Sequence, residues 1–131
     1  MRRRPFLVLI LALLLSGAAV AGCASTIRIG GPQHSCSPGF APSNQFGRIT
    51  AQQRAQGGGV QWGVYPQVAA VRFVVDIWIN KRRFDHKDQD YPPHGSVPAS
   101  VITSGDLFRL EGQAFNARGD VGMFFLTCKA A

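Results

Sequence analysis

The sequence predicts an all-β fold, either an antiparallel β-sandwich or a small barrel. After residue 22 no segment shows a sustained helical period of apolar residues. In the clearest run, residues 68–80, an apolar side chain occupies every second position from Val71 to Ile79. Glycine-containing and polar stretches separate this run from several shorter ones, which is typical of sandwiches and barrels.

Each expected strand has its own signal. Residues 68–80 carry β-branched and aromatic side chains on one fully buried face, and Val74 and Trp78 predict that the second face is partly covered. Residues 81–93 are predicted to be a polar excursion, and the loop 117–120 is predicted to join the last two strands as a hairpin. In chain order, the expected strands are 46–50, 60–65, 68–80, 97–103, 107–116 and 121–129.

The last hairpin also carries a resemblance. Residues 105–119 contain a turn, an alternating strand and the pattern Ala-x-Asn-x-x-Gly, and are similar to the late hairpin of fibronectin type III and immunoglobulin-like domains. Trp62 suits the core tryptophan of those domains, whereas Phe108 and the long segment 81–93 depart from their pattern. The resemblance favours a sandwich over a barrel and implies a binding or spacer module.

The first 22 residues have the three-part layout of an export signal. Arg2, Arg3 and Arg4 precede an apolar segment, 6–15, that is too short to span a bilayer, and small residues follow it. The stretch Val20-Ala21-Gly22-Cys23 resembles the lipobox of bacterial lipoproteins. That resemblance implies cleavage before Cys23 and a covalent lipid on its thiol, with no other cofactor. The alternative is an ordinary secreted protein that is cut near Ala21.

The resemblance also bears on location. By similarity to proteobacterial lipoproteins, Ala24 after the lipidated cysteine implies sorting to the outer membrane of the cell envelope, on either of its faces. Residues 23–44 are rich in Ser, Gly, Pro and Gln and are predicted to be a lipidated polar tether, with 45–131 as the sandwich domain.

Two cysteines remain after Cys23. An exported chain meets an oxidising compartment, so Cys36 and Cys128 are expected to form a structural disulfide. A redox or metal-binding thiol pair is the alternative, but the chain has no CxxC motif.

The charge of the chain excludes one class of partner. Without Arg2, Arg3 and Arg4 the formal net charge falls from +7 to +4. The remaining basic residues are scattered and have no interleaved stacking aromatics, so no nucleic-acid partner is expected. The expected partners are the membrane and envelope proteins, and no small-molecule substrate is evident.

Residues 81–94 hold most of the candidate functional side chains. Asp85, Asp88 and Asp90 raise the possibility of calcium, and His86 and His94 of zinc, but neither set has the spacing of a known site. A solvated surface of paired charges is the simpler interpretation, and a partner-docking surface is the third. The candidate docking residues here are Lys81, Arg82, Arg83, Phe84 and Tyr91.

Arg118-Gly119-Asp120 at the hairpin tip matches a tripeptide that integrins recognise, and Arg118 and Asp120 complete the docking candidates. Glycine and aspartate are also ordinary hairpin-loop residues. The chain has seven acidic residues and three histidines with no recognisable nucleophile motif, so it is not expected to be an enzyme. We therefore expect a membrane-anchored envelope lipoprotein with a structural, assembly or docking role. The alternative is a surface-displayed, adhesin-like binding module.

Overall fold

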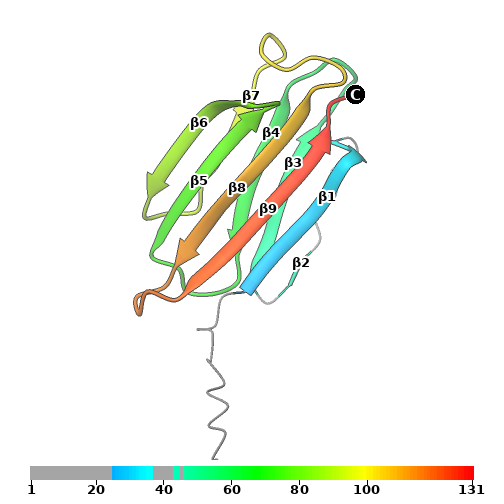
Figure 1. The fold of residues 1–131 in the computed structure, drawn as a ribbon. Helices are drawn as coiled ribbons and strands as arrows, with labels where there is room; N and C mark the ends of the chain where they lie inside the picture. The colour runs from blue at the N-terminus through cyan, green and yellow to red at the C-terminus, as the bar shows by residue number, and fades with distance from the viewer. Residues whose placement is uncertain (1–24, 37–42, 45) are drawn as a thin grey trace, which may run out of the picture.

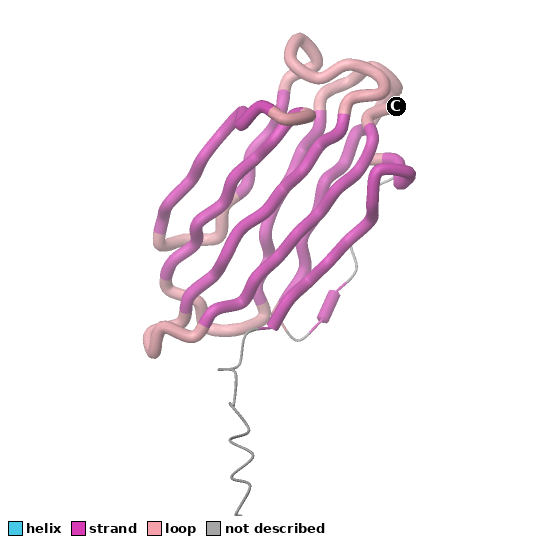
Figure 2. The backbone as a smooth tube through the Cα atoms, in the orientation of Figure 1, coloured by secondary structure: helices cyan, strands magenta, loops and turns pink. Residues whose placement is uncertain are grey.

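A computed structural model of the chain describes residues 25–36, 43, 44 and 46–131. They form two β-sheets packed face to face, and no helix occurs among them (Figures 1 and 2). The expected all-β sandwich is confirmed. The predicted export signal, Cys23 and Ala24 lie outside the described residues.

The larger sheet has five strands. Its neighbours are hydrogen-bonded in the order β1-β9-β8-β5-β6, and the one parallel pairing among the described ladders joins β1 to β9. The strands are β1 (Ser25–Ser35), β5 (Arg72–Ile79), β6 (Arg82–Gln89), β8 (Leu107–Phe115) and β9 (Val121–Lys129).

The smaller sheet has four antiparallel strands in the order β2-β3-β4-β7. The strands are β2 (Ser43–Asn44), β3 (Gly47–Gln53), β4 (Val60–Pro66) and β7 (His94–Val97). The glycine-rich segment between β3 and β4 is a turn, as predicted, and the hairpin of β8 and β9 also matches its prediction.

The predicted tether is wrong for Ser25–Ser35, which forms β1. Its two large apolar residues, Ile27 and Ile29, stand at alternate positions and are both buried against the core. The backbone of β1 pairs with β9, so even a segment poor in apolar residues gains a full ladder of hydrogen bonds. Residues 37–42 of the predicted tether are outside the described part.

The predicted polar excursion at 81–93 is also wrong, because Arg82–Gln89 forms β6. Among the described strands its one partner is β5, so it lies at the edge of its sheet. Charged side chains are common on edge strands because they discourage pairing with other chains. The strand expected at 97–103 is also misplaced. The strand is His94–Val97, and residues 98–103 form turns and irregular backbone.

The order of the strands along the chain differs from that of immunoglobulin domains. In those domains the second and third strands of the chain lie in opposite sheets. Here the second, third and fourth strands, β2, β3 and β4, are antiparallel neighbours within one sheet. The likeness noted in the sequence therefore covers the two-layer architecture and the last hairpin, but not the connectivity.

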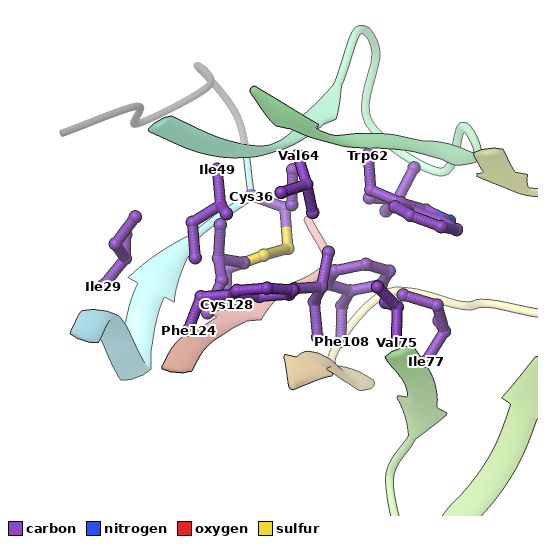
Figure 3. Close-up of a cluster of buried hydrophobic side chains, with 14 of the residues drawn as sticks. Ile29, Cys36, Ile49, Trp62, Val64, Val75, Ile77, Phe108, Phe124 and Cys128 are labelled. Carbon is purple, nitrogen blue, oxygen red and sulfur yellow. A yellow bond between two sulfur atoms is a disulfide. The ribbon is translucent and has the colours of Figure 1, made fainter. Parts of the chain in front are cut away.

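The core lies between the inward faces of both sheets (Figure 3). The rings of Phe46 and Phe124 stack with their centroids 5.6 Å apart. Two glycines make room for them, because a Cβ at Gly112 would meet the ring of Phe124 and a Cβ at Gly122 would meet the ring of Phe46. Trp62, expected in the core, is 3% exposed.

The outward face of the five-stranded sheet is partly covered, as predicted from Val74 and Trp78. Arginine side chains provide part of the cover. The guanidinium of Arg109 lies 4.8 Å from the centre of the Trp78 ring, and that of Arg28 lies 4.8 Å from the centre of the Phe125 ring. Such cation–π contacts shield aromatic surface without requiring a second layer of protein.

The disulfide between Cys36 and Cys128 is confirmed, and it lies within the core (Figure 3). It joins the residue after β1 to β9 across 92 positions of sequence. The carbonyl of Cys36 also accepts a hydrogen bond from Gln53 of β3 in the other sheet, at 2.9 Å. On the chain-entropy model, closing a loop of this length stabilises the fold by about 4–5 kcal/mol.

Candidate docking site

The sandwich has two ends, which we call the upper and lower ends after their places in Figure 1. At the upper end lie the β5–β6 turn, the segment 98–106 and the C-terminus. At the lower end lie the start of β1, the segment 67–71 and the β8–β9 turn 116–120. The registers of the strands support this division, because Ser25 is opposite Gly122.

A groove of about 260 Å³ lies at the upper end. The β5–β6 turn forms one side of it and the segment before β8 forms the other. Its lining residues are Ile79, Asn80, Arg82, Arg83, Phe84, Val101 and Asp106.

The groove combines exposed apolar and cationic side chains. Phe84 is 38% exposed and Val101 is 40% exposed, although both are large apolar residues. Arg83 lies 3.6 Å from Asp76 of β5, whereas Arg82 makes no ion pair with any described carboxylate. An aromatic ring beside an unpaired guanidinium is the composition that protein interfaces favour at their energetic centres.

Asn80 and Asp106 hold the two sides of the groove together. The Asn80 side chain donates a hydrogen bond to the Asp106 carboxylate at 3.0 Å and accepts one from the Leu107 backbone at 3.0 Å. Thr103 donates to the same carboxylate through its backbone N–H, at 2.9 Å, and through its hydroxyl. Asn80 adopts a left-handed backbone conformation with φ of 53°, which asparagine tolerates better than most residues.

These hydrogen bonds also affect titration. The backbone N–H of Thr103 is the main cause, with the Asn80 amide next, of a lowered pKa for Asp106. The carboxylate is therefore charged at neutral and mildly acidic pH. Its hydrogen bonds hold the two sides of the groove together over that pH range.

The structure brings together some of the predicted docking residues. Arg82, Arg83 and Phe84 share the groove, and Lys81 lies in the adjoining turn. Tyr91 is 60% exposed but follows the far end of β6, away from the groove. Sequence reasoning missed Asn80, Val101 and Asp106, because they meet only through the packing of the β5–β6 turn against the segment before β8.

Arg118 and Asp120 lie at the lower end, in the turn between β8 and β9. The Asn116 side chain organises this turn, accepting hydrogen bonds from the backbone N–H groups of Arg118 and Asp120 and donating one to the Asp120 carboxylate at 2.9 Å. The Arg118 side chain is exposed, and the Asp120 carboxylate is exposed but already hydrogen-bonded.

Apart from Arg82, the charged side chains of β6 pair with neighbours. Arg72 and Asp88 form a two-point contact at 2.7 and 2.9 Å, and the hydrogen bond to Arg72 lowers the pKa of Asp88. Asp85 lies 3.5 Å from Lys87, and His86 lies 2.7 Å from Asp76. The expected pairing of charges on a solvated surface is thus observed. Among the described residues, no group of three or more His, Cys, Asp or Glu side chains is placed to hold a metal ion.

A second, larger hollow of about 410 Å³ lies on the outer face of the four-stranded sheet. In the described part of the chain, no carboxylate lines the hollow, and its polar side chains include amides, hydroxyls and one imidazole. They belong to Thr50, Gln52, Gln61, Tyr65, His94 and Ser96.

Comparisons with known proteins do not assign this chain to a family. No family model matches the chain, and no curated protein matches it. Among solved structures, one described as a myokine structure aligns with a TM-score of 0.45 and 10% sequence identity, covering 69% of this chain and 95% of its own. Within the described ranges, no helix has the length and apolar character needed to cross a bilayer.

Proposed function

We propose that this protein is a lipid-anchored component of a bacterial cell envelope that docks a partner protein, and that it performs no chemistry of its own. The lipid anchor is inferred from the lipobox at residues 20–23. The docking role is inferred from the groove at the upper end. The observation that carries it is that one groove holds two exposed apolar side chains, Phe84 and Val101, together with Arg82. Arg82 has no ionic partner among the described residues.

The chemistry of the groove defines the kind of partner. Phe84 and Val101 offer apolar surface that gains free energy when water leaves it, at about 25 cal/mol per Å² buried. Arg82 offers a planar donor that binds carboxylates in a two-point geometry. The partner is therefore expected to insert an apolar side chain flanked by an acidic one.

The hydrogen bonds around Asp106 support a docking role because they hold the groove in one shape. Asn80 and Thr103 both donate hydrogen bonds to that carboxylate, and the backbone N–H of Leu107 donates one to the Asn80 side chain. A surface that is ordered before binding loses less conformational entropy when the partner arrives.

The test begins with the native protein. It is extracted from membranes in mild detergent, the mass of its N-terminal peptide is measured, and co-purifying proteins are identified. We expect a diacyl or triacyl modification on Cys23 and a defined envelope partner. The Cys23→Ser variant is expected to lose both the lipid and the membrane fraction.

Groove variants then locate the contact. Arg82→Glu and Phe84→Ala are expected to release the partner, and Arg118→Glu at the lower end serves as the matched charge-reversal control. An unmodified Cys23 would contradict the anchor. Equal loss of partner in Arg82→Glu and Arg118→Glu would contradict the docking site, and the tripeptide at Arg118 would then become the better candidate.

A further inference from the structure

The start of β1 restricts where an anchored domain can sit. Ser25, the first residue of β1, is paired with Gly122 at the lower end of the five-stranded sheet (Figure 1). Cys23 precedes it by two residues, a stretch that spans at most about 7 Å. A lipid on Cys23 would therefore hold the lower end within that distance of the headgroup layer, with no tether between them.

The same end carries apolar side chains that the core does not use. In the segment between β4 and β5, Val68 is 46% exposed and Val71 is 49% exposed. The Val71 backbone N–H donates to the carbonyl of Phe115 at 2.7 Å, which fixes this segment beside the β8–β9 turn. Arg118 in that turn has an exposed side chain without an ionic partner among the described residues.

The position of this end, where β1 begins, favours a lipid surface over a protein partner, because a lipid on Cys23 would bring the headgroups to it. Small apolar side chains gain free energy at the boundary between headgroups and acyl chains, while an arginine interacts with lipid phosphates. A basic residue near an anionic membrane surface is attracted to it electrostatically. The two valines and Arg118 belong to separate loops, and only a broad surface would contact all three at once.

We propose that the lower end of the sandwich rests on the headgroup layer through Val68, Val71 and Arg118, and that the groove at the upper end faces away from the membrane. This inference depends on the lipid anchor of the proposed function. Because β8 has nine residues at about 3.3 Å each, the groove stands roughly 30 Å above the headgroups. The tripeptide Arg118-Gly119-Asp120 then faces lipid instead of a distant receptor.

The experiment uses the free thiol of Cys23, since the other two cysteines form the disulfide. Residues 23–131, which contain all the described strands, are coupled through Cys23 to maleimide lipids in phosphatidylcholine nanodiscs with a minority of phosphatidylglycerol. A gadolinium-chelating lipid is added, and the loss of backbone NMR signals is measured. We expect strong attenuation for residues 67–71 and 116–120 and intact signals for 98–106. Equal attenuation at both ends would overturn the proposed orientation.

A pair of variants tests the contact itself. Val68→Asp combined with Val71→Asp is expected to reduce the difference in attenuation between the two ends, because the lower end then loses its apolar contact and the domain tilts about its short anchor. Ala99→Asp, an exposed upper-end position outside the groove, is the control and should leave the difference unchanged. An unchanged difference in the double variant would overturn the assignment of the valines. Because the coupling supplies the anchor, these outcomes do not depend on whether the cell lipidates Cys23.

Discussion

The side chain of Asn80 donates a hydrogen bond to the carboxylate of Asp106 at 3.0 Å, across 26 residues of sequence. This contact joins the β5–β6 turn to the segment that leads into β8. Those two pieces of backbone form the two sides of the candidate docking groove. The shape of the groove therefore depends on a pair of polar residues that do not themselves need to touch a partner.

Replacing Asp106 tests this dependence through acid stability. The pKa of Asp106 is lowered in the folded state, so its stabilising effect is present above its unfolded pKa, near 3.9, and is lost as the pH falls through the lower folded value. Asp106→Asn should reduce the free energy of unfolding by about 1 kcal/mol at pH 7. Denaturation followed by circular dichroism from pH 7 to pH 2 should show a shallower acid loss in the variant than in the native protein. Parallel curves would contradict the role of the carboxylate.

A second prediction concerns β1. Ile27 is 4% exposed, whereas its neighbour Arg28 is exposed. Ile27→Ser should destabilise the domain by about 3 kcal/mol, because it leaves a cavity and a polar group in the core. Arg28→Ser loses only the contact with Phe125 and should cost under about 1 kcal/mol. Urea unfolding of both variants gives the comparison, and similar small effects would mean that residues 25–35 behave as a tether in solution.

The disulfide gives a third prediction. Replacing both Cys36 and Cys128 with serine should lower the free energy of unfolding by about 2–5 kcal/mol, since the 92-residue loop is no longer closed in the unfolded chain. Thermal unfolding of the native protein with and without a reducing agent provides an independent check. A double variant as stable as the native protein would show that the bridge contributes nothing to folding.

Gly122 gives a fourth prediction. A methyl group at this position would overlap the ring of Phe46, one half of the stacked aromatic pair in the core. Gly122→Ala should destabilise the domain by about 1–3 kcal/mol, the usual range for overpacking. Adding Phe46→Leu should recover part of that loss by removing the clash. If the second substitution only adds to the first, as independent sites do, the two residues are not in contact.

The strands that sequence analysis located well are those with one buried face. The alternation from Phe73 to Ile79 in β5 reflects a face that is directed into the core, and both strands of the last hairpin show the same pattern. Each of these elements carries enough apolar side chains to be recognised by itself.

The strands that were missed owe their existence to their neighbours. The β6 strand has no buried face and exists because the backbone of β5 offers it hydrogen bonds. The β1 strand has only Ile27 and Ile29 to indicate a buried side, and its pairing with β9 is remote in sequence. A single sequence contains no local signal for such pairing.

The candidate site also has a part that the sequence predicts and a part that only the folded chain reveals. Arg82, Arg83 and Phe84 are adjacent in the chain, so their unusual composition was visible from the sequence. The contribution of Val101 and the contact between Asn80 and Asp106 require the folded chain, because only the packing of the β5–β6 turn against the segment before β8 brings them together.

Site-specific photo-crosslinking in living cells tests the central claim most directly. A photoreactive amino acid is placed at position 101 in the groove or at position 68 at the lower end, two valines of similar exposure at 40% and 46%. The account predicts a discrete protein adduct from position 101 and no protein adduct from position 68. It also predicts that Arg82→Glu abolishes the adduct from position 101. The absence of any protein adduct at position 101, or the same adduct from both positions, would contradict it.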